Sequence, residues 1–192
     1  MTLPKLPLVG DTLLGKYRLG AELGRGGMGV VFEAVHLRMA QKVAIKVLLP
    51  EIAQRPELTH RFEREARAAA RLRGRHTVRV HDVDETPDGL PFLVMEFLEG
   101  RSLRDELARH RQLPIEDAVR YVREACEGVE EAHRAGIIHR DLKPANLFLS
   151  VGGDEQVVKV VDFGIAKTLD AAASDFQTET NTPLGTYRYM SP

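Results

Sequence analysis

A cluster of glycines near the N-terminus could bind phosphate. Residues 24–31 read Gly-Arg-Gly-Gly-Met-Gly-Val-Val, which fits the pattern G-x-G-x-x-G-x-V. Because glycine has no Cβ atom, backbone N–H groups in such a loop can approach phosphate oxygens closely. The same glycines could instead serve only a tight hairpin, and the pattern alone does not separate these two interpretations. A β-branched run follows rather than a helix, which excludes a dinucleotide-binding turn.

A lysine inside an apolar strand is the second candidate. Lys46 ends the run Val-Ala-Ile-Lys at 43–46, so we expect its ammonium group to enter a half-buried cleft. A lysine at a strand edge that reaches water is the simpler alternative. A lysine held in a cleft needs a counter-charge, and the helix expected at 58–72 offers Glu63 and Glu65. The two cannot both face the strand, and we favour Glu65 because it lies nearer the apolar side.

The third candidate is a block of polar residues in the second half of the chain. Residues 137–146 read Ile-Ile-His-Arg-Asp-Leu-Lys-Pro-Ala-Asn, and residues 162–164 read Asp-Phe-Gly. Together with the glycine cluster and Val-Ala-Ile-Lys, in this order, these motifs resemble the protein kinase family. The resemblance covers about residues 14–192.

Two details resemble a particular branch of that family. Lys143, two residues after Asp141, is similar to the serine/threonine branch. Residues 28–31 and 189–192 resemble bacterial kinases of this branch. The expected function is therefore transfer of the ATP γ-phosphate to Ser or Thr hydroxyls of proteins, including those of the chain itself.

The resemblance implies a role for each polar residue in binding ATP and its metal. Phosphoryl transfer requires that negative charge on the γ-phosphate be neutralised. Lys46 would hold the α and β phosphates, and Glu65 would orient Lys46. Asn146 and Asp162 would bind Mg²⁺ or Mn²⁺, which prefer oxygen ligands.

The resemblance also implies which residues act on the substrate hydroxyl. Asp141 would accept its proton and orient it, and Lys143 would stabilise the transferring phosphoryl group. His139 and Phe163 would pack inside the lobe and take no part in the chemistry.

An adenine site follows from the same resemblance. The base would lie between Val31, Ala44 and Phe148, with Met95 at the back of the pocket and backbone groups of 96–98 at its edge. The full set of nucleotide-binding residues expected is Leu23, Gly24, Gly26, Gly29, Val31, Ala44, Lys46, Met95, Glu96, Leu98 and Phe148.

Composition limits the classes of partner. The chain has 192 residues, with 27 Lys+Arg against 28 Asp+Glu and a net charge of -1. This balance argues against a protein that coats nucleic acid or an anionic membrane. No apolar run of membrane-spanning length occurs, so we expect a cytoplasmic chain, unless an anchor follows residue 192. The single cysteine, Cys126, fits a reducing compartment, and we expect it to be a small core residue.

Hydrophobic periodicity predicts the elements that must position these residues. Strands are expected at 17–23, 30–35, 43–49, 78–83, 92–97, 147–149 and 157–161, the first three as an antiparallel meander. One helix is expected at 58–72. A second should begin after a capping box formed by Ser102 and Asp105, and a third should run from Pro114 to Gly136.

The fold class expected is α+β, with a bilobal arrangement like that of protein kinases. Residues 1–13 would form an irregular lead-in, and residues 14–98 a β-rich N-lobe with one long helix and the start of the hinge. Residues 99–192 would form the first part of a mainly helical C-lobe, up to the activation segment.

Two charged or modifiable segments stay outside this assignment. Residues 61–75 hold six arginines and two glutamates. We favour a solvated helix face there over an anion contact, although part of it could meet a phosphorylated loop. Arg140 directly before Asp141 resembles kinases controlled by such a phosphate. We therefore expect autophosphorylation at Thr178 and Thr180, with self-association during that reaction.

The end of the chain departs from the family pattern. A glutamate and further helices follow this point in the family, so we expect a fragment that leaves Tyr121, Val122 and Val129 partly uncovered. Residues 185–187 also differ from the usual pattern, although Thr186 is kept. The alternative function is therefore a non-catalytic nucleotide-binding or scaffolding fragment.

Overall fold

The computed structural model describes residues 4–152 and 155–163, and the chain divides into two compact units. The first unit comprises Met1–Arg73 and Val78–Leu98, and the second comprises Gly74–Thr77 and Glu99–Pro192. The short segment 74–77 thus belongs to the second unit, although the residues on both sides of it belong to the first.

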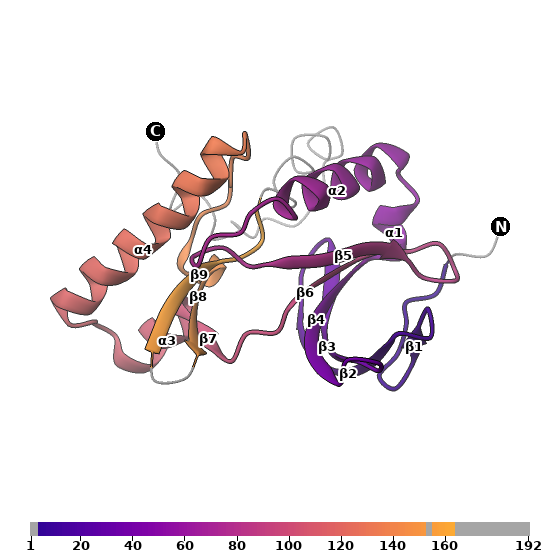
Figure 1. Ribbon diagram of the computed structural model, residues 1–192, viewed down its shortest axis with the longest axis horizontal. Coiled ribbons are helices and arrows are strands. Elements are labelled where there is room, and N and C mark those ends of the chain that lie inside the picture. The colour runs from indigo at the N-terminus through magenta and orange to yellow at the C-terminus, as the bar shows by residue number, and fades with distance from the viewer. Residues whose placement is uncertain (1–3, 153–154, 164–192) are drawn as a thin grey trace, which may run out of the picture. The chain divides into compact units, whose positions relative to one another are not determined.

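The first unit is built on an antiparallel sheet of six strands, in the order β1-β2-β3-β4-β6-β5 (Figure 1). The strands are β1 (Thr12–Leu13), β2 (Tyr17–Arg25), β3 (Gly29–His36), β4 (Gln41–Leu48), β5 (Val80–Glu85) and β6 (Pro91–Glu96). Strands β2, β3 and β4 pair successively with antiparallel register, which confirms the expected meander. Residues 12–13, expected to be irregular, pair with β2, and the side chain of Leu13 is buried.

Strand alternation gives this sheet two distinct faces. Every second residue of β3, β4 and β6 enters one hydrophobic core, whose members include Val30, Phe32, Ile45, Val47, Phe92 and Val94. The residues between them point to the other face, because side chains alternate along a strand. That second face carries Val31, Ala44, Lys46 and Met95, four of the expected nucleotide-binding residues.

Two helices follow β4, namely α1 (Pro50–Ala53) and α2 (Pro56–Ala69). The expected helix at 58–72 is α2, which begins earlier because Pro56 takes the first helical position, where its missing N–H costs nothing. Helix α2 packs against β5 and β6, as Figure 1 shows for β5. It does so through its buried residues Leu58, Phe62, Ala66 and Ala69.

The second unit combines a small sheet with two helices. Its antiparallel strands are β7 (Gly100–Ser102), β8 (Leu147–Gly152) and β9 (Glu155–Val160). Its helices are α3 (Leu103–His110) and α4 (Ile115–Arg134), and a 3-10 turn η1 (Pro144–Asn146) precedes β8.

The capping box expected at the start of α3 is present. Ser102 is the N-cap residue, and its Oγ accepts a hydrogen bond from Asp105 N at 3.2 Å. The Ser102 hydroxyl also donates to Asp105 Oδ2 at 2.6 Å, and this hydrogen bond lowers the pKa of Asp105. Residues 102 and 105 therefore fix the point at which α3 begins.

Helix α4 corrects two expectations from the sequence. Cys126, expected in the core, is exposed. It continues an exposed apolar row formed by Ile115, Val119 and Val122. Val122 is 60% exposed, whereas Tyr121, expected to be partly uncovered, is buried. The buried side of α4 instead includes the polar residue Glu124 and the small residue Gly128.

No helix among the described residues is both long enough and apolar enough to cross a membrane.

Candidate functional site

The glycine cluster forms the turn between β2 and β3. Gly24 pairs with Val31, and Gly26 N donates to Gly29 O at 3.0 Å. At Gly29 an added Cβ would lie 2.6 Å from Val47 O, so packing requires glycine at this position. At Gly24 and Gly26 an added Cβ would meet no atom within 4 Å, and neither residue has a left-handed φ. Packing against β4 therefore explains only the last glycine of the pattern.

Lys46 lies in the middle of the sheet face that is opposite the hydrophobic core. In the ladder it stands between Val31 of β3 and Leu93 of β6. Ala44, two residues before it, stands opposite Met95 on the same face. Lys46 is only 8% exposed, so it is not an edge lysine that reaches water. The strand register thus groups the basic side chain with three of the apolar residues expected around the nucleotide.

Helix α2 separates the two glutamates that could serve Lys46. Glu63 binds the exposed Arg67 at 2.9 Å, which draws its carboxylate toward the outer side of the helix. Both glutamates are half-buried, but Glu65 directly precedes the buried Ala66, and its Oε2 atom is buried. This arrangement supports the choice of Glu65 over Glu63.

The remaining nucleotide-binding candidates of the first unit differ in exposure. Leu23 is exposed, and Leu98 is half-buried. The Glu96 side chain accepts a hydrogen bond from Arg79 N at 2.7 Å, and Glu96 N donates to Arg79 O at 2.9 Å. The amide and the carboxylate of Glu96 are thus both engaged with the backbone of Arg79.

In the second unit, Asp141 is the centre of a compact polar group. Its side chain is 8% exposed, and its Oδ2 lies 2.7 Å from Lys143 Nζ. Asn146 Nδ2 donates to Asp141 O at 2.8 Å and to Oδ2 at 3.2 Å. Among the described residues, the buried Asp141 Oδ1 has no hydrogen-bond partner. A buried carboxylate oxygen without a partner is costly, so this atom can accept a hydrogen bond from a ligand.

His139 supports this group from inside the unit. Its Nε2 lies 3.0 Å from Val161 O, and its Nδ1 accepts from Asp141 N at 3.3 Å. The ring also packs on Phe163, with centroids 5.1 Å apart. Burial lowers the pKa of His139, against the opposing effects of the Val161 carbonyl and two nearby carboxylates.

Two residues of the group have left-handed backbone conformations that the sequence did not reveal. Arg140 has φ 61° and Asp162 has φ 59°. Such conformations are uncommon outside glycine and cost roughly 1–3 kcal/mol each. Arg140 directly precedes Asp141, and Asp162 is itself one of the expected metal ligands.

Asn146 and Asp162 suit a hard divalent cation. Asn146 donates through its amide nitrogen to Asp141, which leaves its side-chain oxygen for a ligand. Val161 N donates to Asn146 O at 3.0 Å, so the chain before Asp162 is tied to the chain at Asn146. Carboxylate and amide oxygens are the ligands that Mg²⁺ prefers. Within the described part of the chain, no group of three His, Cys, Asp or Glu residues is arranged to hold a metal ion.

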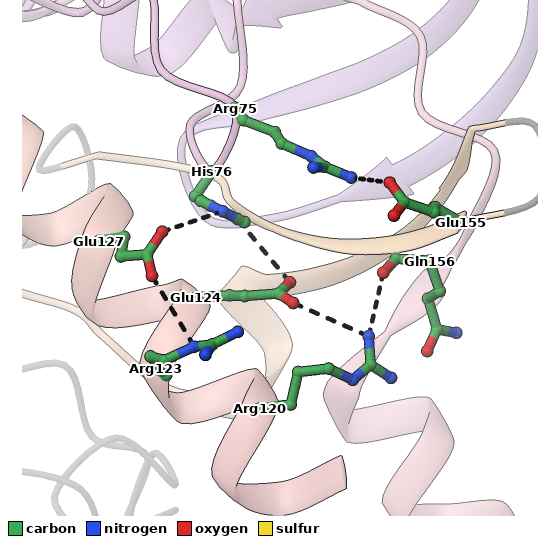
Figure 2. A pocket seen from close by; sticks show the side chains of 8 residues that line it. All are labelled: Arg75, His76, Arg120, Arg123, Glu124, Glu127, Glu155 and Gln156. Carbon is green, nitrogen blue, oxygen red and sulfur yellow. Dashed lines mark hydrogen bonds and ion pairs between the residues drawn. The ribbon is translucent and has the colours of Figure 1, made fainter.

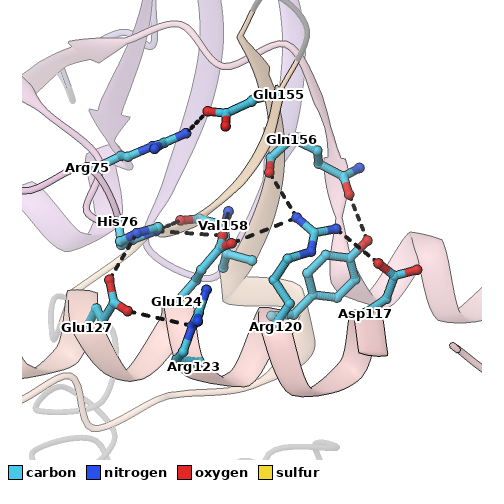
Figure 3. Close-up of polar contacts among 11 residues, drawn as sticks. Arg75, His76, Asp117, Arg120, Arg123, Glu124, Glu127, Glu155, Gln156 and Val158 are labelled. Carbon is cyan, nitrogen blue, oxygen red and sulfur yellow. Dashed lines mark hydrogen bonds and ion pairs between the residues drawn. The ribbon is translucent and has the colours of Figure 1, made fainter. Parts of the chain in front are cut away.

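A second polar cluster, which the sequence did not predict, joins segment 74–77 to α4 and β9. His76 Nδ1 lies 2.9 Å from Val158 O, and His76 Nε2 lies 3.3 Å from Glu127 Oε2 (Figure 3). Glu124 accepts a hydrogen bond from Val158 N at 2.8 Å. Glu131 accepts from Gly74 N at 2.7 Å and from Thr77 Oγ1 at 2.9 Å.

The same cluster lines a cavity of about 520 Å³ (Figure 2). Its charges compensate one another. Arg75 pairs with Glu155, and Arg123 lies 3.8 Å from Glu127. Arg120 donates to Gln156 O at 3.0 Å and to Asp117 at 3.1 Å. The cavity is therefore part of the anchor of segment 74–77. A signal in the sequence that could have indicated this anchor is Gly128, a glycine in the interior of α4 that lies against His76.

A model of the protein kinase domain matches residues 17–192. The chain belongs to the protein kinase family. It is 40% identical over 190 residues to the serine/threonine-protein kinase PknA of Mycobacterium tuberculosis, and this match covers 97% of this chain and 43% of that protein. It is 42% identical over 187 residues to the serine/threonine-protein kinase Pkn1 of Myxococcus xanthus, covering 97% of this chain and 26% of that protein. Within the family, this kinase domain is thus of the bacterial serine/threonine type.

Solved structures agree with this fold. The PknI kinase domain of Mycobacterium tuberculosis matches with a TM-score of 0.72 and 33% identity, over 84% of this chain and 64% of that chain. The chain spans less than half the length of the curated relatives named above. The family uses ATP and a divalent metal. Thr178, Thr180 and Thr186, as well as the glycine of Asp-Phe-Gly, lie outside the described residues.

Proposed function

We propose that this chain carries the nucleotide-binding and phosphotransfer residues of a Mg²⁺-dependent serine/threonine protein kinase. The observation that carries the proposal is Asp141, a buried carboxylate held by Lys143 and Asn146 with one oxygen left for a ligand. A general base must hold an unshared acceptor at the place where the substrate hydroxyl arrives.

In the proposed reaction, the substrate hydroxyl oxygen bonds to the γ-phosphorus of ATP. The bond from this phosphorus to the oxygen shared with the β-phosphate breaks, the hydroxyl proton passes to Asp141, and ADP leaves. Lys143 lies beside Asp141 and stabilises negative charge on the transferred group. Asn146 and Asp162 would hold Mg²⁺, which would supply positive charge against the phosphates.

The first unit supplies the rest of the nucleotide contacts in this proposal. Lys46 holds the α and β phosphates, and Glu65 orients it. Gly24 and Gly26 allow backbone N–H groups to approach the phosphates, a role supported by the absence of any packing reason for these two glycines. Adenine lies against the sheet face of Val31, Ala44 and Met95, which the strand register brings together.

The substrates are Ser and Thr side chains of proteins, in the cytoplasm where ATP is available. We include Thr178 and Thr180 of a second copy among them, which requires brief self-association. The alternative, a domain that binds nucleotide without transfer, shares the contacts of the first unit and differs only in turnover.

Turnover of ATP labelled in its γ-phosphate tests the proposal. We expect label on Ser and Thr, and we expect Asp141→Asn to reduce its rate by about 100-fold or more, because the proton acceptor is lost. Asp88→Asn, an exposed aspartate in a turn, is the matched control and should leave the rate unchanged. Equal rates for Asp141→Asn and the unchanged chain would refute the catalytic assignment, and nucleotide binding without any transfer would favour the alternative.

A further inference from the structure

Segment 74–77 adds a further edge to the small sheet of the second unit. Thr77 and Val160 form an isolated parallel bridge, and Val160 N donates to His76 O at 2.8 Å. Val160 is the last residue of β9, and on its other side it pairs with Leu147 of β8. The end of β9 is therefore held between β8 and segment 74–77.

The side chain of Glu131, on α4, holds both ends of this segment. Its Oε1 accepts a hydrogen bond from Gly74 N at 2.7 Å, and its Oε2 accepts one from Thr77 Oγ1 at 2.9 Å. Thr77 is only 1% exposed, so its hydroxyl group needs a partner within the protein. A Cβ atom at residue 74 would overlap the Glu131 carboxylate, so glycine lets this carboxylate lie close to the backbone.

The end of β9 leads directly to the two proposed metal ligands. Val161, which follows Val160, donates from its N atom to Asn146 O at 3.0 Å. The carbonyl oxygen of Val161 lies 3.0 Å from His139 Nε2. Asp162 is the next residue along the chain. The position of Val160 therefore affects where the backbone of Asp162 lies.

The backbone of Asp162 has a conformation that needs such support. Its φ of 59° lies in the left-handed region, which is uncommon outside glycine. Such conformations persist where the surrounding structure holds them in place. Of the contacts on the two residues before Asp162, those with segment 74–77 depend on Glu131.

A carboxylate suits the placement of this segment better than it suits general stability. Burial of a charged group costs free energy that an apolar side chain would not cost, and Glu131 is half-buried. In return, its two oxygens accept directional, charge-assisted hydrogen bonds, which fix where Gly74 and Thr77 lie.

We propose that Glu131 is a positioning residue for metal binding. Through segment 74–77 it holds the end of β9, and thereby the backbone of Asp162, in the arrangement that binds the divalent cation. This inference rests on the proposed function, in which Asp162 is a metal ligand. Glu131 acts through the backbone and is not itself a ligand.

Calorimetric titration with the non-hydrolysable analogue β,γ-imido-ATP tests this proposal without any turnover. The affinity measured with Mg²⁺, divided by the affinity measured in EDTA, gives the gain in affinity that the metal supplies. We expect Glu131→Ala to lose most of this gain, since removal of a group that supports a metal ligand costs about 10–100-fold in metal affinity. The affinity of this variant in EDTA should stay close to that of the unchanged chain.

Glu131→Gln should rescue the gain. Its side-chain oxygen can accept from Gly74 N, and its NH₂ group can donate to Thr77 Oγ1. The Thr77 hydroxyl can then donate to Gly74 O, which lies 3.3 Å away. Glu130→Ala is the matched control, because it removes a neighbouring exposed carboxylate that pairs with Arg134. It should leave the gain unchanged.

Thr77→Val removes one of the two hydrogen bonds at nearly constant shape, so we expect it to reduce the gain as well. It decides the test if Glu131→Ala does not fold. A lower unfolding free energy with an unchanged gain, in both Glu131→Ala and Thr77→Val, would mean that the anchor only stabilises the fold. Equal losses of the gain in Glu130→Ala and Glu131→Ala, or in Glu131→Gln and Glu131→Ala, would also overturn the proposal.

Asp162→Asn separates this inference from the proposed function. If Asp162→Asn keeps the full gain, Asp162 is not a metal ligand and the proposed function is wrong on this point. If Asp162→Asn loses the gain while Glu131→Ala keeps it, only the inference about Glu131 is wrong.

Discussion

At the scale of single residues, His139 is placed so that only its neutral form fits. Val161 O can only accept, so Nε2 must carry a proton, and the Asp141 N–H needs Nδ1 as an acceptor. A second proton on Nδ1 would face this N–H and break the bond. Burial acts in the same direction: it lowers the pKa of His139, because the charged ring would lose its hydration.

This placement makes the stability of the chain depend on pH. The unfolded chain binds a proton at His139 below a pH of about 6.5, before the folded chain does, so acid favours unfolding. The contribution of His139 to the free energy of unfolding has its full value above that pH. It decreases as the pH falls, and it stops decreasing once the folded form is protonated as well.

We expect urea titrations to show the unfolding free energy decreasing from about pH 8 to pH 5. His139→Phe keeps a ring beside Phe163 but cannot titrate. This variant should be less stable at the higher pH and should lose less stability on acidification. Parallel pH profiles for the two proteins would show that His139 does not cause the dependence.

At the scale of elements, α4 is shaped by a segment far away in the sequence. Its buried side contains Glu124 and Gly128 because both face segment 74–77 or β9. An added Cβ at Gly128 would collide with the carbonyl oxygen of His76. That oxygen also accepts a hydrogen bond from Val160 N at 2.8 Å, so it cannot move away without breaking this hydrogen bond.

Gly128→Ala should therefore destabilise the chain, although alanine is the better helix former by about 1 kcal/mol. We expect a net loss of about 1–3 kcal/mol in the free energy of unfolding. Cys126→Ala lies two residues away on the exposed side and should change it by less than about 0.5 kcal/mol. Equal stability of the two variants in thermal and urea unfolding would show that His76 does not pack closely against Gly128.

At the scale of the whole molecule, the proposed chemistry is divided between two units. Lys46 belongs to the first unit, and Asp141 belongs to the second. If both act on one phosphoryl transfer, their contributions to its rate depend on each other.

A double-mutant cycle measures this dependence. Lys46→Met and Asp141→Asn should each slow transfer by about 100-fold or more, and the double variant should be about as slow as the slower single variant. Multiplied losses in the double variant would mean that the two residues act independently.

The sequence by itself determined the elements that carry the site and the family to which they belong. Alternation at 30–35 and 43–49 follows from the period of two along a strand, and the capping box needs only two residues three positions apart, Ser102 and Asp105. The kinase motifs were recognisable for the same reason, since each of them is contiguous.

Only the tertiary structure decided which side of α4 is buried. The sequence placed Cys126 in the core, whereas Glu124 and Gly128 are buried and Cys126 is exposed. Local periodicity could not show this, because the partners of α4 include Gly74, which lies 57 residues from Glu131. Burial of a polar side chain depends on whether a distant segment supplies its hydrogen-bond partner, and that partner exists only once the chain has folded.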